Sequence, residues 1–293
     1  MKTTYALFPF SCLLAGCASA QPGSQAPEAP TPGSSAPTAQ PNPGPSSPAA
    51  ASPGPSAASS AALAAPAPSS SAPPAPATAA GPCDSESVLV KGGTFTTHGA
   101  KQEATINDLC VDVRETTARQ YAECVSAGAC NADKVACAEQ ATYGNPERLD
   151  HPMVCVTFSQ AEAYCAYRNK RLPRTEEWEW VARGGELARK FPWGDAPPSD
   201  QLCWSGVKGR ALSCPVGSFP SGDNPQGIHD LAGNVLEFTT TSMDSKSPVR
   251  IARGGAWRDG VEELVRTGRV GGFQLSYRCG FLGIRCVAEA RGQ

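Results

Sequence analysis

The stretch Asn224-Pro-Gln-Gly-Ile-His-Asp-Leu-Ala-Gly-Asn-Val-Leu-Glu-Phe238 organises the chain, because it combines acids, glycines and buried-type apolar residues in one short run. Within it, Asp230, Gly233, Val235 and Glu237 are spaced so that a looped backbone could direct two carboxylates and two carbonyl oxygens at one point. Calcium is held by such flexible all-oxygen sets. The alternative is a tight polar turn that leads into a short strand, and the spacing alone favours this alternative.

The composition predicts an exported protein and gives no sign of nucleic-acid binding. The chain has 293 residues, a formal net charge of −2 and 13 cysteines. A nearly neutral chain has no electrostatic attraction to nucleic acid or anionic lipid. Because this many cysteines are unusual in a reducing compartment, we expect export and disulfides. No apolar run reaches the length of a membrane-spanning helix.

The first 17 residues predict a lipoprotein signal peptide. A short basic start, Met1-Lys2, precedes a mostly apolar run that ends in Leu14-Ala15-Gly16-Cys17. Small residues before a cysteine resemble the bacterial lipobox, in which Cys17 becomes the lipidated N-terminus; the alternative is an ordinary secretory signal. Acyl chains such as palmitate would anchor the protein to a membrane surface. No Asp follows Cys17, which implies sorting to the outer membrane of a diderm bacterium.

Residues 18–82 predict a disordered tether. They are almost entirely Ala, Pro, Ser and Gly, with Glu28 as the single charge. Such a composition lacks the large apolar side chains that offset the entropy of ordering. The tether would span about 45 Å as a flexible coil and about 200 Å when fully extended.

Residues 83–293 have the length of one larger domain and predict an α+β fold with much irregular backbone. Capping-box patterns predict two helices, one from Thr117 to about Ala127 and one from Thr157 to about Arg168. A third helix is expected with Thr175 as its N-cap and two glutamates in its first turn. From Gln201 onward, short strands and turns are expected.

The order of short motifs in this domain resembles the formylglycine-generating enzyme family, also called the sulfatase-modifying-factor domain. The resemblance implies a loop-rich, C-type-lectin-like α+β fold over nearly all of residues 83–287. The motifs that carry it are Gly92–Phe95, Val111–Thr117, His151–Val154, Ala163–Cys165, Lys170–Pro173, Glu177–Glu179, Ala182–Gly185, Phe191–Gly194, Asn224–Gly227, Ala232–Val235, Arg253–Gly255 and Gly283–Cys286.

The resemblance changes the interpretation of the opening stretch. Asp230, Gly233, Val235 and Glu237 fall on positions that look like calcium ligands of the family, so one calcium site is expected there. A second family site is not matched, because Leu202 stands where an oxygen ligand would be needed. In its place Cys203 and Cys214 are close enough in sequence to close a short loop, and such a disulfide would contribute about 3 kcal/mol.

The family's chemistry depends on two thiols that this chain lacks. Relatives oxidise a sulfatase cysteine to formylglycine with oxygen and a copper ion held by two cysteine thiolates. Asp259 and Leu264 stand where those cysteines would be. Because Cu(I) prefers sulfur ligands, we expect no copper site. The predicted function is a non-catalytic binding or scaffold domain on a lipid anchor, with an unidentified protein or glycan ligand. The alternatives are a formylglycine-generating oxidase or another oxygen-dependent or redox activity on the same fold.

The resemblance also implies a disulfide between Cys165 and Cys286. Removal of the signal peptide and lipidation of Cys17 leave eleven cysteines in the domain. An odd number leaves one outside any intramolecular pair, and Cys279 is the candidate.

Overall fold

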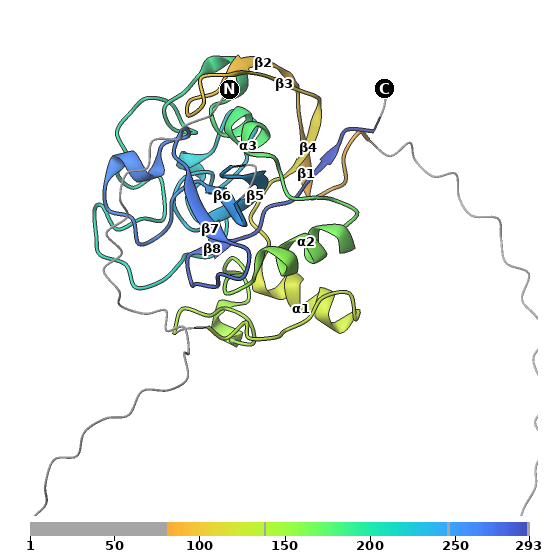
Figure 1. Cartoon of the computed structure of the whole chain (residues 1–293). Coiled ribbons are helices and arrows are strands. Elements are labelled where there is room, and N and C mark those ends of the chain that lie inside the picture. Colours follow the sequence, from red (N-terminus) through yellow and green to blue (C-terminus); the bar gives the residue numbers. More distant parts are fainter. Residues whose placement is uncertain (1–80, 138, 245–246, 292–293) are drawn as a thin grey trace, which may run out of the picture. The chain divides into compact units, whose positions relative to one another are not determined.

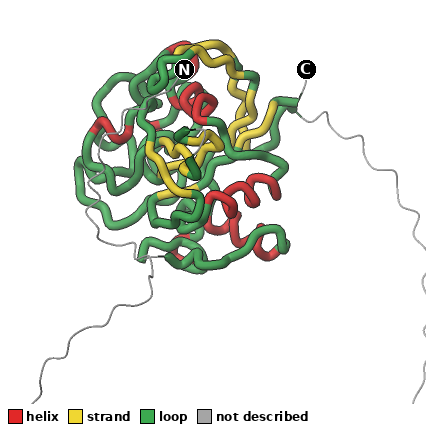
Figure 2. Tube along the Cα trace, in the orientation of Figure 1, coloured by secondary structure: helices red, strands yellow, loops and turns green. Residues whose placement is uncertain are grey.

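The computed structural model describes residues 81–137, 139–244 and 247–291, which form the folded domain shown in Figure 1. The predicted signal peptide with Cys17, and all of the predicted tether except its last two residues, lie outside the described residues. Three helices and several short strands are joined by long loops, which make up most of the domain (Figure 2). None of the described helices has the length and apolar character needed to span a bilayer.

The strands form three small sheets. The first has the order β1-β4-β9, with β1 Ser87–Val90, β4 Leu109–Asp112 and β9 Val287–Glu289. The second pairs β2 Gly93–Thr96 with β3 Glu103–Ile106. The third has the order β7-β6-β5-β8, with β7 Gly271–Gln274, β6 Val249–Arg253, β5 Leu236–Ser242 and β8 Leu282–Gly283. The strand β9 near the C-terminus therefore completes the sheet that contains the first strand.

Two of the helices begin as predicted. The first, α1 Ala118–Ser126, and the second, α2 Phe158–Tyr167, each have a complete capping box, formed by Thr117 with Gln120 and by Thr157 with Gln160. These boxes satisfy backbone N–H groups that would otherwise lack partners at the helix start.

The start of the third helix differs from the prediction. The helix α3 runs over Thr175–Ala182, so Thr175 is its first residue and Arg174 is the N-cap. The Glu177 carboxylate accepts a hydrogen bond from the Arg174 N–H at 2.7 Å. Glu177, the third residue of the helix, therefore caps the helix start, and the Thr175 hydroxyl does not act as a cap.

The core consists of neighbouring buried clusters rather than one layer. One gathers side chains of α1, α2, β5 and β8. Another packs α3 against β1, β2, β3 and β4, with Trp180 in contact with Phe95 at a ring-centroid distance of 5.4 Å. Figure 1 shows α1 and α2 together and α3 apart from them, beside the β2–β3 hairpin. Ile228, in the stretch that precedes β5, and Leu236, the first residue of β5, belong to these clusters.

Candidate functional site

The turn that follows β6 leads through the two positions, Asp259 and Leu264, at which the family resemblance implies copper-binding thiols. Asp259 closes this turn: its Oδ2 accepts a hydrogen bond from the Ala256 N–H at 2.8 Å, and its own N–H donates to the Ala256 carbonyl at 2.9 Å. Leu264 lies farther along, in a 3-10 turn spanning Glu262–Val265. One carboxylate and one hydrocarbon side chain therefore stand at the two expected thiol positions.

The Asp259 carboxylate has a structural partner and a partly buried setting. Burial raises its pKa, while the Ala256 N–H bond and the nearby Arg258 and Arg269 guanidinium groups lower it. Hard carboxylate oxygen is a poor substitute for a thiolate toward Cu(I). The side chains at this turn therefore do not fit the copper ion that the resemblance implies.

A disulfide-closed loop braces the same turn. The Ser205 N–H donates to the Asp259 carbonyl at 2.9 Å, and the Ser205 hydroxyl donates to the Trp257 carbonyl at 2.9 Å. Ser205 belongs to the loop closed by the expected Cys203–Cys214 disulfide. The turn is thus held from outside by two hydrogen bonds to its main-chain carbonyls.

Five disulfides cross-link the described domain. The two expected pairs, Cys165–Cys286 and Cys203–Cys214, are both present. The other three are Cys83–Cys110, Cys124–Cys130 and Cys137–Cys155. Cys279 is buried and lies outside these five pairs. Its neighbour Gly280 accepts a hydrogen bond from the Trp257 indole at 2.9 Å, so the fold brings this distant part of the chain to the turn.

The expected calcium stretch lies beside a buried cluster of charges. Glu237 is fully buried and pairs with Arg285, whose guanidinium donates to both carboxylate oxygens at 2.8–3.0 Å. The Trp178 indole also donates to Glu237, at 2.6 Å. Asp230 accepts from the Gly217 N–H at 2.6 Å. Glu115, which sequence reasoning did not single out, accepts from the Val235 N–H at 3.2 Å.

The charges of this cluster do not balance. Burial, followed by the neighbouring Asp230 and Glu237 carboxylates, raises the pKa of Glu115 well above its usual value, and the Arg285 guanidinium opposes the rise only in part. Burial also raises the pKa of Asp230. Three carboxylates face one guanidinium, which leaves an excess of two negative charges when all are ionised. In charge, the cluster fits a divalent cation.

Not all of the four expected residues are equally available as calcium ligands. Both oxygens of Glu237 already accept hydrogen bonds. Asp230 and main-chain carbonyls are therefore the more available calcium ligands. Gly233 has a φ of 78°, and a Cβ there would lie 2.5 Å from the Cys203 carbonyl oxygen. Across the described part of the chain, no three His, Cys, Asp or Glu side chains are placed to hold a metal together. Calcium here would depend on backbone oxygens.

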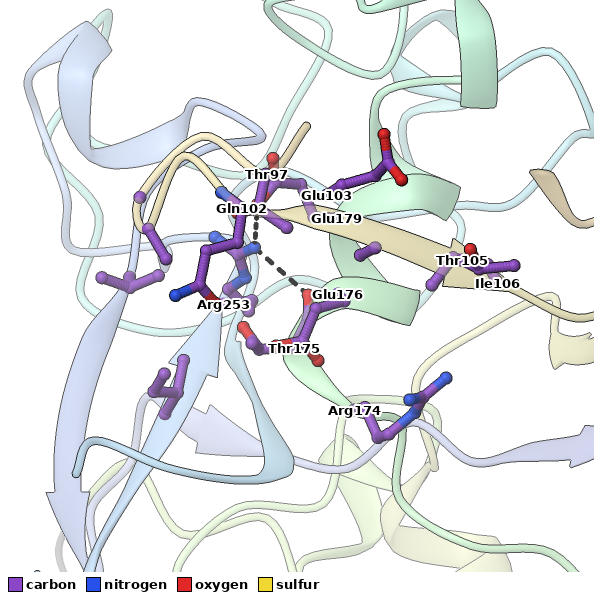
Figure 3. Close-up of a pocket in the computed structure, with 15 residues that line it drawn as sticks. Thr97, Gln102, Glu103, Thr105, Ile106, Arg174, Thr175, Glu176, Glu179 and Arg253 are labelled. Atoms are coloured by element: carbon purple, nitrogen blue, oxygen red, sulfur yellow. Dashed lines mark hydrogen bonds and ion pairs between the residues drawn. The ribbon is translucent and has the colours of Figure 1, made fainter. Parts of the chain in front are cut away.

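A pocket of about 270 Å³ lies elsewhere, between the β2–β3 hairpin, the start of α3 and β6. Figure 3 shows Thr175 and Arg253 close together in it, and the Arg253 Nη2 donates to the Thr175 carbonyl at 3.2 Å and to Glu179 at 2.5 Å. Polar residues from all three elements line the pocket, and its volume lies below that of most drug-sized ligand sites. It does not include Asp259 or Leu264.

Comparison with known proteins agrees with this architecture. The chain is 40% identical over 126 residues to the bovine (Bos taurus) "Inactive C-alpha-formylglycine-generating enzyme 2", which covers 40% of this chain and 42% of the relative. It is 31% identical over 172 residues to the "Formylglycine-generating enzyme" of Streptomyces coelicolor, covering 49% and 54%. The chain thus spans about half the length of these relatives, or less.

A solved structure shares the fold of this domain, and a family model matches its sequence. PvdO from Pseudomonas aeruginosa superposes with a TM-score of 0.57 over 69% of this chain and 94% of that one, at 21% identity. The sulfatase-modifying factor enzyme 1-like domain matches residues 73–290, which is most of the chain. By this match, the chain belongs to the sulfatase-modifying factor enzyme 1-like family.

Proposed function

We propose that this domain does not oxidise cysteine and acts as an extracytoplasmic binding or scaffold domain. The observation that carries the proposal is the turn after β6, where the Asp259 carboxylate closes the backbone and Leu264 supplies a hydrocarbon. A linear dithiolate site for Cu(I) needs two soft sulfur ligands at these positions. The similarity to a protein named as inactive is consistent with this proposal, although the domain is also similar to an active enzyme.

Copper binding and catalysis test the proposal together. The full chain is titrated with Cu(I) in competition with a chelator, and it is incubated with oxygen, copper and a sulfatase-derived cysteine peptide. We expect no tight copper site and no aldehyde by mass spectrometry. One Cu(I) per chain that persists in a Cys279→Ser variant, together with peptide aldehyde, would overturn the proposal. The Asp259→Cys/Leu264→Cys double variant is the matched comparison, and it is expected to gain copper affinity.

We further propose that Cys17 carries the lipid anchor and that the protein faces an oxidising compartment. The five disulfides support the second part of this proposal, because such bonds persist mainly outside reducing compartments. Palmitate labelling of the full chain, expressed in a diderm host and fractionated into inner and outer membranes, tests the first part. We expect label in the outer-membrane fraction and none in a Cys17→Ala variant. Label that survives this substitution would show that the anchor is not at Cys17.

We also propose that one calcium ion binds beside the buried charge cluster, through Asp230 and the main-chain carbonyls of Gly233 and Val235. Glu237 would contribute its charge while it remains paired with Arg285. When bound, calcium would stabilise the stretch between the loop and β5 and would supply no redox chemistry. The excess negative charge of the cluster supports this proposal.

A further inference from the structure

The edge of β3 that faces away from β2 borders the 270 Å³ pocket. Five consecutive residues, Gln102 to Ile106, line this pocket. Successive side chains of a strand point to opposite faces of the sheet, so a pocket on one face would be lined by alternate residues. Lining by consecutive residues shows that the pocket follows the edge of the strand, where the main chain is accessible.

The pairing register identifies the main-chain groups that face away from β2. The Thr97 N–H donates to the Gln102 carbonyl at 2.9 Å, and the register continues through Phe95 opposite Ala104. Hydrogen-bonded and non-hydrogen-bonded pairs alternate in an antiparallel ladder. The N–H and C=O groups of Glu103 and Thr105 therefore point away from β2. Within the residues that the structure describes, this sheet has two strands, so no third strand pairs with that edge.

The two outer edges of this hairpin differ. On the β2 side, the Thr96 carbonyl accepts a hydrogen bond from Arg183 at 3.2 Å, so a side chain covers part of that edge. On the β3 side, the sequence Glu103-Ala-Thr-Ile106 contains no proline and no lysine, the residues that commonly blunt an exposed edge. Its outward-facing groups are thus available for pairing.

The opposite wall of the pocket holds a second, independent feature. Thr175, the first residue of α3, is 6% exposed, and its hydroxyl has no hydrogen-bond partner among the residues that the structure describes. The main-chain N–H of Thr175 donates a hydrogen bond to the Thr241 hydroxyl at 3.0 Å. A buried hydroxyl without a partner is unusual in a folded protein, and a group bound at this wall could supply the missing hydrogen bond. Ile106, Ile251 and Val270 add apolar surface to the same pocket.

We propose that this pocket binds an extended peptide, which adds a strand to the free edge of β3. The peptide main chain pairs with Glu103 and Thr105, and one of its carbonyl or N–H groups meets the Thr175 hydroxyl. The small volume limits the position that faces inward to a small side chain. Strand addition of this kind gives affinity through main-chain hydrogen bonds and selectivity through alternate side chains. The inference rests on the proposed binding role and names its partner class.

A selection from a library of random eight-residue peptides, using the full chain, provides the test. Clones are selected on the wild-type protein after depletion on a Thr105→Pro variant, and the enriched peptides are synthesised. Proline at this position removes an outward-facing N–H and leaves the pairing with β2 intact. Thr94→Pro is the matched control, because Thr94 lies opposite Thr105, its N–H faces the other edge, and both variants lose the same Thr94–Thr105 hydroxyl contact of 3.2 Å.

We expect the enriched peptides to bind about tenfold more weakly to Thr105→Pro, as the loss of one good hydrogen bond implies, and to bind Thr94→Pro within about twofold of wild type. N-methylation of alternate peptide nitrogens should abolish binding in one register only, a readout that needs no protein variant. Thr175→Val should weaken binding with the fold retained.

Three results would overturn the inference: no clone that distinguishes wild type from Thr105→Pro, equal binding of the N-methylated peptides in both registers, or a monosaccharide that binds the pocket where these peptides do not. Each leaves the copper measurement unaffected, so failure of this inference is separable from failure of the proposed function.

Discussion

Replacing Arg285 with methionine tests the buried charge cluster most directly. Arg285 is 1% exposed and donates to both oxygens of Glu237, to the Asp112 carbonyl at 2.9 Å and to the His229 carbonyl at 2.7 Å. Methionine fills similar space but leaves the Glu237 carboxylate buried without its countercharge. Breaking a buried pair in this way costs about 3–5 kcal/mol.

The expected loss is large enough to measure with the disulfides intact. Urea unfolding of wild type and variant gives the change in the free energy of unfolding. A melting temperature would fall by about 6–20 °C, at about 2–4 °C per kcal/mol for a domain of this size. Arg171→Met is the control, because Arg171 is partly exposed and its partner Glu177 keeps the contact with Arg174. We expect that variant to lose about 1 kcal/mol or less.

A loss below about 1 kcal/mol for Arg285→Met would refute the reasoning. It would mean that the negative charge of Glu237 is compensated by something other than this guanidinium. A loss for Arg171→Met as large as that for Arg285→Met would be equally damaging, since burial would then not decide the cost.

Three further predictions concern the metal, the disulfides and pH. In calorimetry, calcium should raise the melting temperature of wild type, whereas Asp230→Asn should melt higher than wild type in EDTA and respond little to calcium; equal responses of the two would contradict the proposed site. Replacing Cys165 and Cys286 together with alanine should cost about 5 kcal/mol in urea unfolding, because their 121-residue separation closes a long loop, and a loss under about 2 kcal/mol would argue against that entropic account. The ring of His151 contacts the Ser213 hydroxyl at 3.1 Å, and burial lowers the pKa of this histidine. The folded state therefore favours the neutral ring, so the protein is most stable with respect to this group above pH 6.5 and loses stability as pH falls below that value. His151→Gln should flatten this part of a plot of melting temperature against pH, and an unchanged slope would assign the dependence to other groups.

Local signals in the sequence were sufficient for the helices that begin with capping boxes. At Thr117 and Thr157 the required side chains lie three residues from their backbone partners, so the contact is encoded locally. At Thr175 the same kind of reasoning failed, because the Glu177 carboxylate bonds the Arg174 N–H instead. The Thr175 hydroxyl and the Glu177 carboxylate are both local candidates for capping, and sequence alone does not rank them.

The sequence by itself determined the family and the two expected disulfide pairs, and it has Asp259 and Leu264 where the resemblance implies two thiols, since each of these depends on which residues stand at matched positions. Only the tertiary structure placed Glu115 beside Asp230 and Arg285 beside Glu237, although they lie 115 and 48 residues apart along the chain. Only the structure could show that the edge of β3 faces a pocket whose far wall is α3. The physical reason is that charge balance and edge pairing depend on distances through space, which the packing of loops sets and residue spacing along the chain does not.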